Sequence, residues 1–224
     1  MRDLIIVGAG GFAREVAGAV HALRRTWRLL GYVDDDPATH DRQFGGIPVR
    51  GPSDVVCALP DVAVVVCVGS PRDYGVRQRI VRRLRLPAHR YATVVHPSAD
   101  VGPGCAVGTG SALLAQVVLT ADATVGTHVA IMPQAVVTHD CRVSDYATIA
   151  SGVRLGGRVR IGPGAYVGAG ALIREGVTIG DSALVGMGSV VLSDVPPGQV
   201  WAGNPARYRR PADLSETTAG RARR

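Results

Sequence analysis

A strict six-residue period runs through the second half of the chain. From Val95 onward the sequence divides into seventeen consecutive six-residue units without an insertion, and each unit begins with Val, Leu or Ile. The residue four places after each leading aliphatic is small or β-branched, as in Ala99, Cys105 and Ser111. Self-similarity at a fixed period is the signature of a repeat architecture, so this register constrains the fold more than any other feature.

The period predicts a parallel β-helix of triangular cross-section. Each unit supplies one short strand with an inward aliphatic side chain, and three units complete one coil of roughly eighteen residues. Seventeen units therefore make between five and six stacked coils. An ordinary β-sandwich alternates with a period of two and does not produce a period of six. Such a narrow prism has no room for aromatic rings, which agrees with the chain's two Phe and two Trp.

The first half of the chain has the pattern of a small α/β domain. Strand-like apolar runs alternate there with helical patterns, which favours a parallel sheet whose ligands bind at the carboxyl ends of its strands. The predicted strands cover residues 4–7, 29–33 and 62–68, and the predicted helices cover residues 11–25, 53–59 and 73–84.

These patterns divide the chain into three parts. We expect a Rossmann-like α/β nucleotide-binding domain over residues 1–92 and an all-β parallel β-helix over residues 93–208. An Arg-rich segment over residues 209–224 is expected to form a flexible tail.

Composition limits the partners and the compartment. All 25 basic residues are Arg, and the net charge of +7 suits anionic ligands such as nucleotides or coenzyme A. A solvated basic face is the simpler interpretation of the same charge, so we predict no nucleic-acid partner. The four cysteines show no CxxC spacing and are expected to be reduced. No apolar run is long enough to span a membrane, and we expect a cytoplasmic protein without a membrane partner.

A glycine-rich loop follows the first predicted strand. Its sequence, Gly8-Ala9-Gly10-Gly11-Phe12, allows backbone N–H groups to approach a phosphate at a helix N-terminus. Acidic residues after the second strand can accept hydrogen bonds from a ribose or a uracil. The loop departs from the dinucleotide fingerprint because Ala13 stands at the third glycine position, although an NAD domain stays an alternative. About 90 residues is short for a full dinucleotide fold, which favours a nucleotide sugar.

The combination of the two domains resembles the hexapeptide-repeat sugar acetyltransferase family, whose members modify amino groups or hydroxyls of sugars. The resemblance covers residues 2–208 and implies a left-handed β-helix, a homotrimer, acetyl-CoA as acyl donor and no metal. It also implies that six residues hold a nucleotide-sugar substrate: Gly10, Gly11, Phe12, Asp34, Asp35 and Gly69. The matching segments are Gly8 to Phe12, Asp34-Asp35, Val68-Gly69-Ser70, Thr138-His139-Asp140 and Gly203-Asn204-Pro205-Ala206.

His139 is the predicted general base, with Asp140 as its acidic partner. His139 is the third residue of the unit Val137–Arg142, a position from which side chains can leave the prism. Acyl transfer from a thioester needs a base that takes the proton of the attacking amine or hydroxyl, and imidazole suits this task near neutrality. The family transfers the acyl group directly, and the chain lacks the motifs of a Ser or Cys nucleophile.

The same resemblance implies four contacts with coenzyme A, at Thr148, Gly157, Ala169 and Met187. Relatives carry a histidine at the position of Thr148, so a hydroxyl would replace that contact here. Coenzyme A is expected to lie in the groove between neighbouring prisms, where an extended pantetheine can bond exposed strand backbone.

The resemblance implies acetyl transfer to the amine of a UDP- or dTDP-linked amino sugar, and three alternatives to this function stay open. O-acetylation of a sugar or another small metabolite would use the same base. A hexapeptide carbonic anhydrase would need three zinc-binding histidines, but His96, His128 and His139 occupy different positions within their units. A non-catalytic nucleotide-sugar sensor or scaffold would bind its ligand without acyl transfer.

Overall fold

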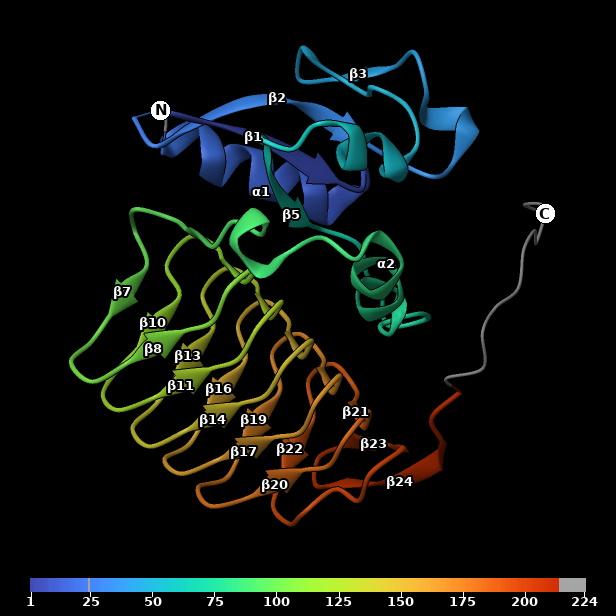
Figure 1. The fold of residues 1–224 in the computed structure, drawn as a ribbon. Coiled ribbons are helices and arrows are strands. Elements are labelled where there is room, and N and C mark those ends of the chain that lie inside the picture. The colour runs from blue at the N-terminus through green and yellow to red at the C-terminus, as the bar shows by residue number, and fades with distance from the viewer. Residues whose placement is uncertain (24, 214–224) are drawn as a thin grey trace.

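The computed structural model of the protein describes residues 1–23 and 25–213. An α/β domain sits on a parallel β-helix, and the chain crosses between them after η3 (Ala88–Arg90) and before β6 (Val94–Val95) (Figure 1). Within the described residues, no helix has both the length and the apolarity that a membrane crossing requires.

The α/β domain contains a three-stranded parallel sheet in the order β2-β1-β5. Side chains alternate along β1: Leu4 and Ile6 pack in the cluster that contains α1, and Ile5 packs with α2 on the other side. Both faces of the sheet are therefore packed against other elements, as the continuous apolar runs predict. The elements are β1 (Arg2–Val7), α1 (Gly11–Ala22), β2 (Trp27–Val33), η1 (Pro37–Thr39), β3 (Gln43–Phe44), β4 (Ile47–Pro48), η2 (Ser53–Ala58), β5 (Ala63–Val66) and α2 (Val76–Leu84).

All three predicted helices of the α/β domain differ from the expectation, and α1 ends at Ala22 instead of residue 25. The helix predicted from residue 73 begins at Val76, because Ser70 and Asp73 instead form a turn in which the Asp73 N–H donates to the Ser70 carbonyl at 3.0 Å. The short helix after Ser53 is a 3₁₀-helix, and the Ser53 hydroxyl donates to Asp35 instead of capping it.

The prism is built from two-residue strands that form three faces. Strands pair in parallel with the strand one coil later, as Val118 pairs with Val136. The first face contains β6, β9 (Ala112–Leu113), β12 (Ala130–Ile131), β15 (Thr148–Ile149), β18 (Tyr166–Val167) and β21 (Leu184–Val185). The second contains β7 (Asp100–Val101), β10 (Val118–Leu119), β13 (Val136–Val137), β16 (Arg154–Leu155), β19 (Leu172–Ile173) and β22 (Val190–Val191). The third contains β8 (Ala106–Val107), β11 (Thr124–Val125), β14 (Arg142–Val143), β17 (Arg160–Ile161) and β20 (Thr178–Ile179).

The interior of the prism follows the register read from the sequence. The leading aliphatic of each unit is the second residue of its strand, and from Leu113 to Val191 these side chains are buried. The small residues four places later, such as Ala123 and Ala135, lie in the same core cluster. Val101 is 40% exposed because β7 ends its face and has a neighbouring coil on one side only. The predicted parallel β-helix is therefore confirmed.

The chain closes the prism with an antiparallel pair, β23 (Gln199–Gly203) and β24 (Ala206–Pro211). Arg209 and Arg210 lie in β24, although the sequence placed them in the tail that starts at residue 209. Residues 214–224 of that tail lie outside the described part of the chain.

The α/β domain covers the first face of the prism. Outward side chains of that face lie against it: Ala112 is buried in the same cluster as α1, and the half-buried Tyr166 contacts Tyr74. Tyr74 also donates through its hydroxyl to the Ser182 carbonyl at 2.9 Å. Because the cross-section is triangular, the edge between the second and third faces, here called the second–third edge, lies opposite this domain.

Candidate active site

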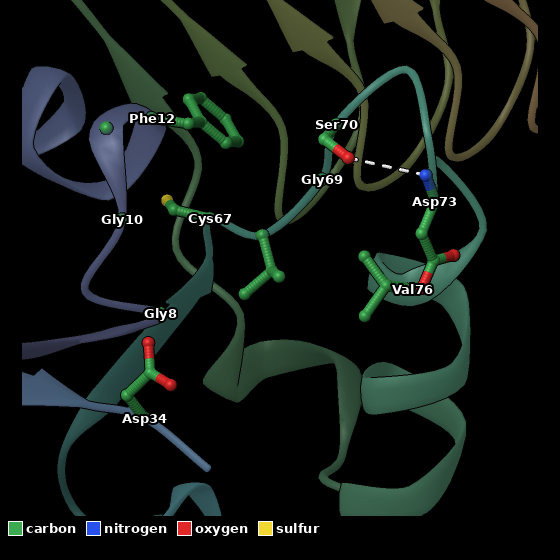
Figure 2. Close-up of a pocket in the computed structure, with 11 residues that line it drawn as sticks. Gly8, Gly10, Phe12, Asp34, Cys67, Gly69, Ser70, Asp73 and Val76 are labelled. Atoms are coloured by element: carbon green, nitrogen blue, oxygen red, sulfur yellow. Dashed lines mark hydrogen bonds between the residues drawn. The ribbon is translucent and has the colours of Figure 1, made fainter. Parts of the chain in front are cut away.

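A cavity of about 300 Å³ opens at the carboxyl ends of β1 and β5. Figure 2 shows Phe12 and Cys67 on the side of α1, and Ser70, Asp73 and Val76 on the side of α2. The structure brings five of the six predicted substrate residues to this cavity. They are Gly10, Gly11, Phe12, Asp34 and Gly69.

The glycines of the first loop have different physical roles. Gly8 has φ +106°, and a Cβ there would lie 2.7 Å from the Cys67 carbonyl oxygen, so only glycine fits. A Cβ on Gly10 or Gly11 would meet nothing within 4 Å, which leaves the start of α1 open to the cavity. The first turn of α1 has no acidic side chain, and its unpaired N–H groups can bind an anion such as a phosphate.

Asp34 holds this loop in place at the floor of the cavity. Its two carboxylate oxygens accept the N–H groups of Ala9 at 2.7 Å and of Asp36 at 2.9 Å. Each oxygen keeps further lone pairs, so the carboxylate can still accept a hydrogen bond from a ligand.

Asp35, the sixth predicted substrate residue, does not line the cavity. Its carboxylate accepts the Ser53 N–H at 2.9 Å and the Ser53 hydroxyl at 2.7 Å, and it pairs with Arg83. Although partial burial raises the pKa of Asp35, hydrogen bonds from Arg83 and Ser53 hold it below its usual range. The structure therefore gives this carboxylate a role within the α/β domain.

Sequence reasoning did not assign five other cavity residues to the site: Cys67, Val68, Ser70, Asp73 and Val76. All of them follow β5, where the rule for carboxyl ends of parallel strands could have located them. Asp73 was missed because the predicted helix over residues 73–84 included it.

His139 and Asp140 lie on the second–third edge, in the turn between β13 and β14. The His139 Nδ1 is 2.7 Å from the Asp140 Oδ2, and both side chains are about half exposed. Because an ionised carboxylate only accepts hydrogen bonds, this contact favours the imidazole tautomer in which Nδ1 carries the proton and Nε2 presents a lone pair. This arrangement can take a proton from an incoming acceptor.

Gly157 makes room for the imidazole of His139. It occupies the same position one coil later, and a Cβ built there would lie 2.5 Å from the His139 Cε1 and Nε2 atoms. The structure thus gives Gly157 a packing reason that is independent of coenzyme A.

We expect Gly157→Ala to displace the His139 ring while the prism stays folded. A base moved by about 1 Å can cost about 10²-fold in rate, so kcat should fall by about that factor. The control is Gly18→Ala on α1, where the new methyl group meets nothing within 4 Å and kcat should not change. Steady-state kinetics and a crystal structure of the variant check the prediction, and an unmoved imidazole would contradict it.

The other three predicted coenzyme A contacts lie elsewhere on the prism. Thr148 is in β15 under the α/β domain, and its hydroxyl accepts a hydrogen bond from Arg77 at 2.8 Å. Ala169 and Met187 lie one coil apart on the edge between the first and second faces, and Met187 is 79% exposed. Within one chain, these residues and Gly157 do not form a single site.

The three histidines of the zinc alternative are also separated within one chain. His128 is buried and stacks on Tyr146, whereas His139 is exposed on the second–third edge. His128 occupies an outward position of the repeat, but the α/β domain covers that turn and buries its side chain. Among the described residues no group of three His, Cys, Asp or Glu is arranged to hold a metal.

Comparison with known proteins places this geometry in a family. The PglD N-terminal domain family matches residues 3–84, and the bacterial transferase hexapeptide family matches residues 158–193. PerB from Caulobacter crescentus, solved with CoA and GDP-perosamine, is 32% identical, with a TM-score of 0.82 over 93% of this chain and 98% of that one. The chain belongs to the hexapeptide-repeat sugar acetyltransferase family.

Two other members of this sugar acetyltransferase family match the chain, one over nearly its whole length and one over about half of it. The acetyltransferase domain of PglB from Neisseria gonorrhoeae, in complex with acetyl coenzyme A, is 30% identical with a TM-score of 0.82, over 93% of this chain and 99% of that one. UDP-N-acetylbacillosamine N-acetyltransferase of Bacillus subtilis is 32% identical over 117 residues. That match spans about half of each protein, 51% of this chain and 52% of the relative.

Proposed function

We propose that this protein transfers an acetyl group from acetyl-CoA to the amine of a nucleotide-linked amino sugar. The observation that carries the proposal is the presence of two complementary parts in one chain. The cavity at α1 offers an anion site suited to a nucleotide phosphate, and the prism presents a half-exposed His139–Asp140 pair. A relative similar over 98% of its length was solved with CoA and GDP-perosamine, which supports the same two ligands here.

The proposed reaction is direct transfer. The sugar amine attacks the thioester carbonyl of acetyl-CoA while the His139 Nε2 takes the proton that the amine loses. Asp140 holds the other ring nitrogen, fixes the tautomer and stabilises the imidazolium that forms. The C–S bond then breaks, coenzyme A leaves as a thiolate, and the proton on His139 can neutralise that thiolate.

A second copy of the chain is needed to complete the site. The nucleotide cavity belongs to the domain on the first face, whereas His139 lies on the opposite edge of the same prism. Four of the six outward residues of the second face are apolar, and Leu172 among them is 47% exposed; they are Val118, Val136, Leu172 and Val190, and the other two are Asp100 and Arg154. A partly exposed and largely apolar face of this kind is typical of a surface that other chains cover.

We therefore propose a homotrimer with the second faces around the three-fold axis. The second face is flanked by His139 and Gly157 on one edge and by Ala169 and Met187 on the other. Three-fold packing places the edge with His139 and Gly157 beside the edge with Ala169 and Met187 of a neighbouring prism. The coenzyme A residues that are separated within one chain would then line one groove. Thr148 is not part of this proposal, because Arg77 occupies its hydroxyl.

We place this activity in the cytoplasm. All four cysteines of the chain are free thiols, which fits a reducing compartment.

The test is a panel of UDP-, dTDP- and GDP-linked 4-amino sugars with acetyl-CoA, read by mass spectrometry of the product. We expect one of these sugars to gain an acetyl group on nitrogen, which survives mild alkaline treatment that removes O-acetyl esters. If only a hydroxyl gains the acetyl group, the acceptor is that hydroxyl and the proposed N-acetylation is wrong. Binding of nucleotide sugars without turnover by any acyl-CoA would contradict the enzymatic proposal.

A further inference from the structure

A buried arginine joins the two domains. Arg77, in the first turn of α2, is 2% exposed, and no carboxylate among the described residues pairs with it. Its guanidinium instead donates to five oxygen atoms. They are the carbonyls of Val68 at 3.4 Å, His128 at 2.8 Å, Tyr146 at 2.8 Å and Ala147 at 3.1 Å, and the Thr148 hydroxyl at 2.8 Å.

The acceptors on the prism follow its repeat. His128 and Tyr146 occupy the same position in successive coils, and the Ser182 carbonyl, two coils further on, accepts from Tyr74. The α/β domain is thus docked on one column of turn carbonyls by Arg77 and Tyr74. The planar guanidinium suits this task because its donors diverge in a fixed geometry and can reach two coils at once.

The same arginine touches the wall of the nucleotide cavity. Its Nη1 donates to Val68, and a Cβ on Gly69 would lie 3.6 Å from that nitrogen. Val68, Gly69, Asp73 and Val76 all line the cavity, and they flank Arg77 in sequence or in space. Any shift of Arg77 therefore moves this wall relative to the prism.

Burying a cation that has only neutral hydrogen-bond acceptors has a large desolvation free energy, which indicates a specific role for Arg77. Burial lowers the pKa of Arg77 to about 10, so the guanidinium is still charged at neutral pH. Hydrogen bonds to the Thr148 hydroxyl and to three carbonyls of the prism offset part of its desolvation energy.

We propose that Arg77 is a positioning residue that fixes the 68–76 wall of the nucleotide-sugar cavity on the prism, with Thr148 as its partner. This inference rests on the proposed function for its substrate. It assigns Thr148 to acceptor positioning, whereas the family resemblance implied a contact with the acetyl donor.

The chain offers a matched control in Arg90. This arginine is also buried, at 6% exposed, but its donors reach the carbonyls of Val62 at 2.8 Å and Val56 at 3.1 Å inside the α/β domain. Arg77→Met and Arg90→Met both remove a buried arginine, and only the first breaks the contact between domains.

We expect Arg77→Met to raise KM for the acetylated nucleotide amino sugar by about 10-fold, with KM for acetyl-CoA changed by less than about 2-fold. Thr148→Val removes one acceptor and should raise the same KM by about 2- to 5-fold without unfolding the protein. Arg90→Met should lose stability and leave KM for the nucleotide sugar unchanged. The inference is overturned if KM for acetyl-CoA rises in Thr148→Val, or if Arg77→Met and Arg90→Met have the same kinetics.

Hydrogen exchange gives a readout that needs no substrate. Amides of α2 should exchange faster in Arg77→Met than in Arg90→Met, while the prism strands of both variants stay protected. Equal protection of α2 in the two variants would refute the positioning role. If the wild type acetylates no sugar of the panel, the proposed function fails, and the exchange experiment still decides the role of Arg77.

Discussion

Replacing His139 with asparagine is expected to lower kcat by about 10²- to 10⁴-fold, the usual contribution of a general base. Asparagine has a similar size, so the turn between β13 and β14 should stay intact and KM for both substrates should change little. The lost group is the Nε2 lone pair, which no neighbour can replace: Asp140 contacts the other ring nitrogen, and Gly157 beneath the ring has no side chain.

Steady-state kinetics with the acetylated nucleotide amino sugar measure this effect. His89→Asn is the matched control, because His89 is an exposed histidine on η3 and should keep full activity. Full activity in His139→Asn would show that the acceptor amine loses its proton to another group or to water, and the proposed mechanism would be wrong.

The stability of the wild type is expected to fall by about 3 kcal/mol between pH 6.5 and pH 4 because of His128 alone. Burial and the charge of Arg77 lower the pKa of His128 to about 4, against an ordinary value of 6.5, and Asp145 offsets this only in part. Its ring is stacked on Tyr146 and lies edge-on to Tyr91, and the buried Nδ1 has no hydrogen-bond partner among the described residues.

The sign follows from the order of protonation. As the pH falls below 6.5, the unfolded chain binds a proton at His128 before the folded chain does, so protonation favours unfolding. The contribution of the neutral histidine is complete above pH 6.5 and is lost as the pH falls toward 4.

Carboxylates also titrate in this window, so the measurement is a difference between two proteins. His128→Phe keeps a flat ring between Tyr91 and Tyr146 and removes the titrating group. Free energies of unfolding from urea titrations at several pH values should diverge for the two proteins below pH 6.5. Parallel pH profiles would show that His128 is protonated equally in both states.

Much of the fold could be predicted from the sequence because the prism follows a six-residue repeat. A coil repeats the same backbone path, so the six-residue register alone fixed which side chains face inward from Leu113 to Val191. The glycine-rich loop was equally readable, since the conformation of Gly8 and the open space at Gly10 and Gly11 are properties of one strand–helix turn. The His139–Asp140 pair joins neighbouring residues, and its contact needs no distant partner.

The sequence did not predict the roles of residues that depend on contacts between distant parts of the chain. Arg77 shares α2 with three other arginines, and no local pattern marks it as the buried one. It is buried because α2 docks on turns that lie more than fifty residues later in the chain. His128 and Thr148 occupy ordinary outward positions of the repeat, and docking of the α/β domain covers them. Asp35 was predicted to bind the substrate, and its partners Ser53 and Arg83 are distant in the sequence. These two side chains reach the carboxylate only in the folded domain.

The sequence by itself thus determined the β-helix, the nucleotide-type loop and the candidate base, because each follows from a period or a contact within a few residues. Only the tertiary structure decided which outward side chains stay available for chemistry. That choice depends on where the α/β domain covers the first face, and docking through Arg77 and Tyr74 involves residues that no local pattern connects.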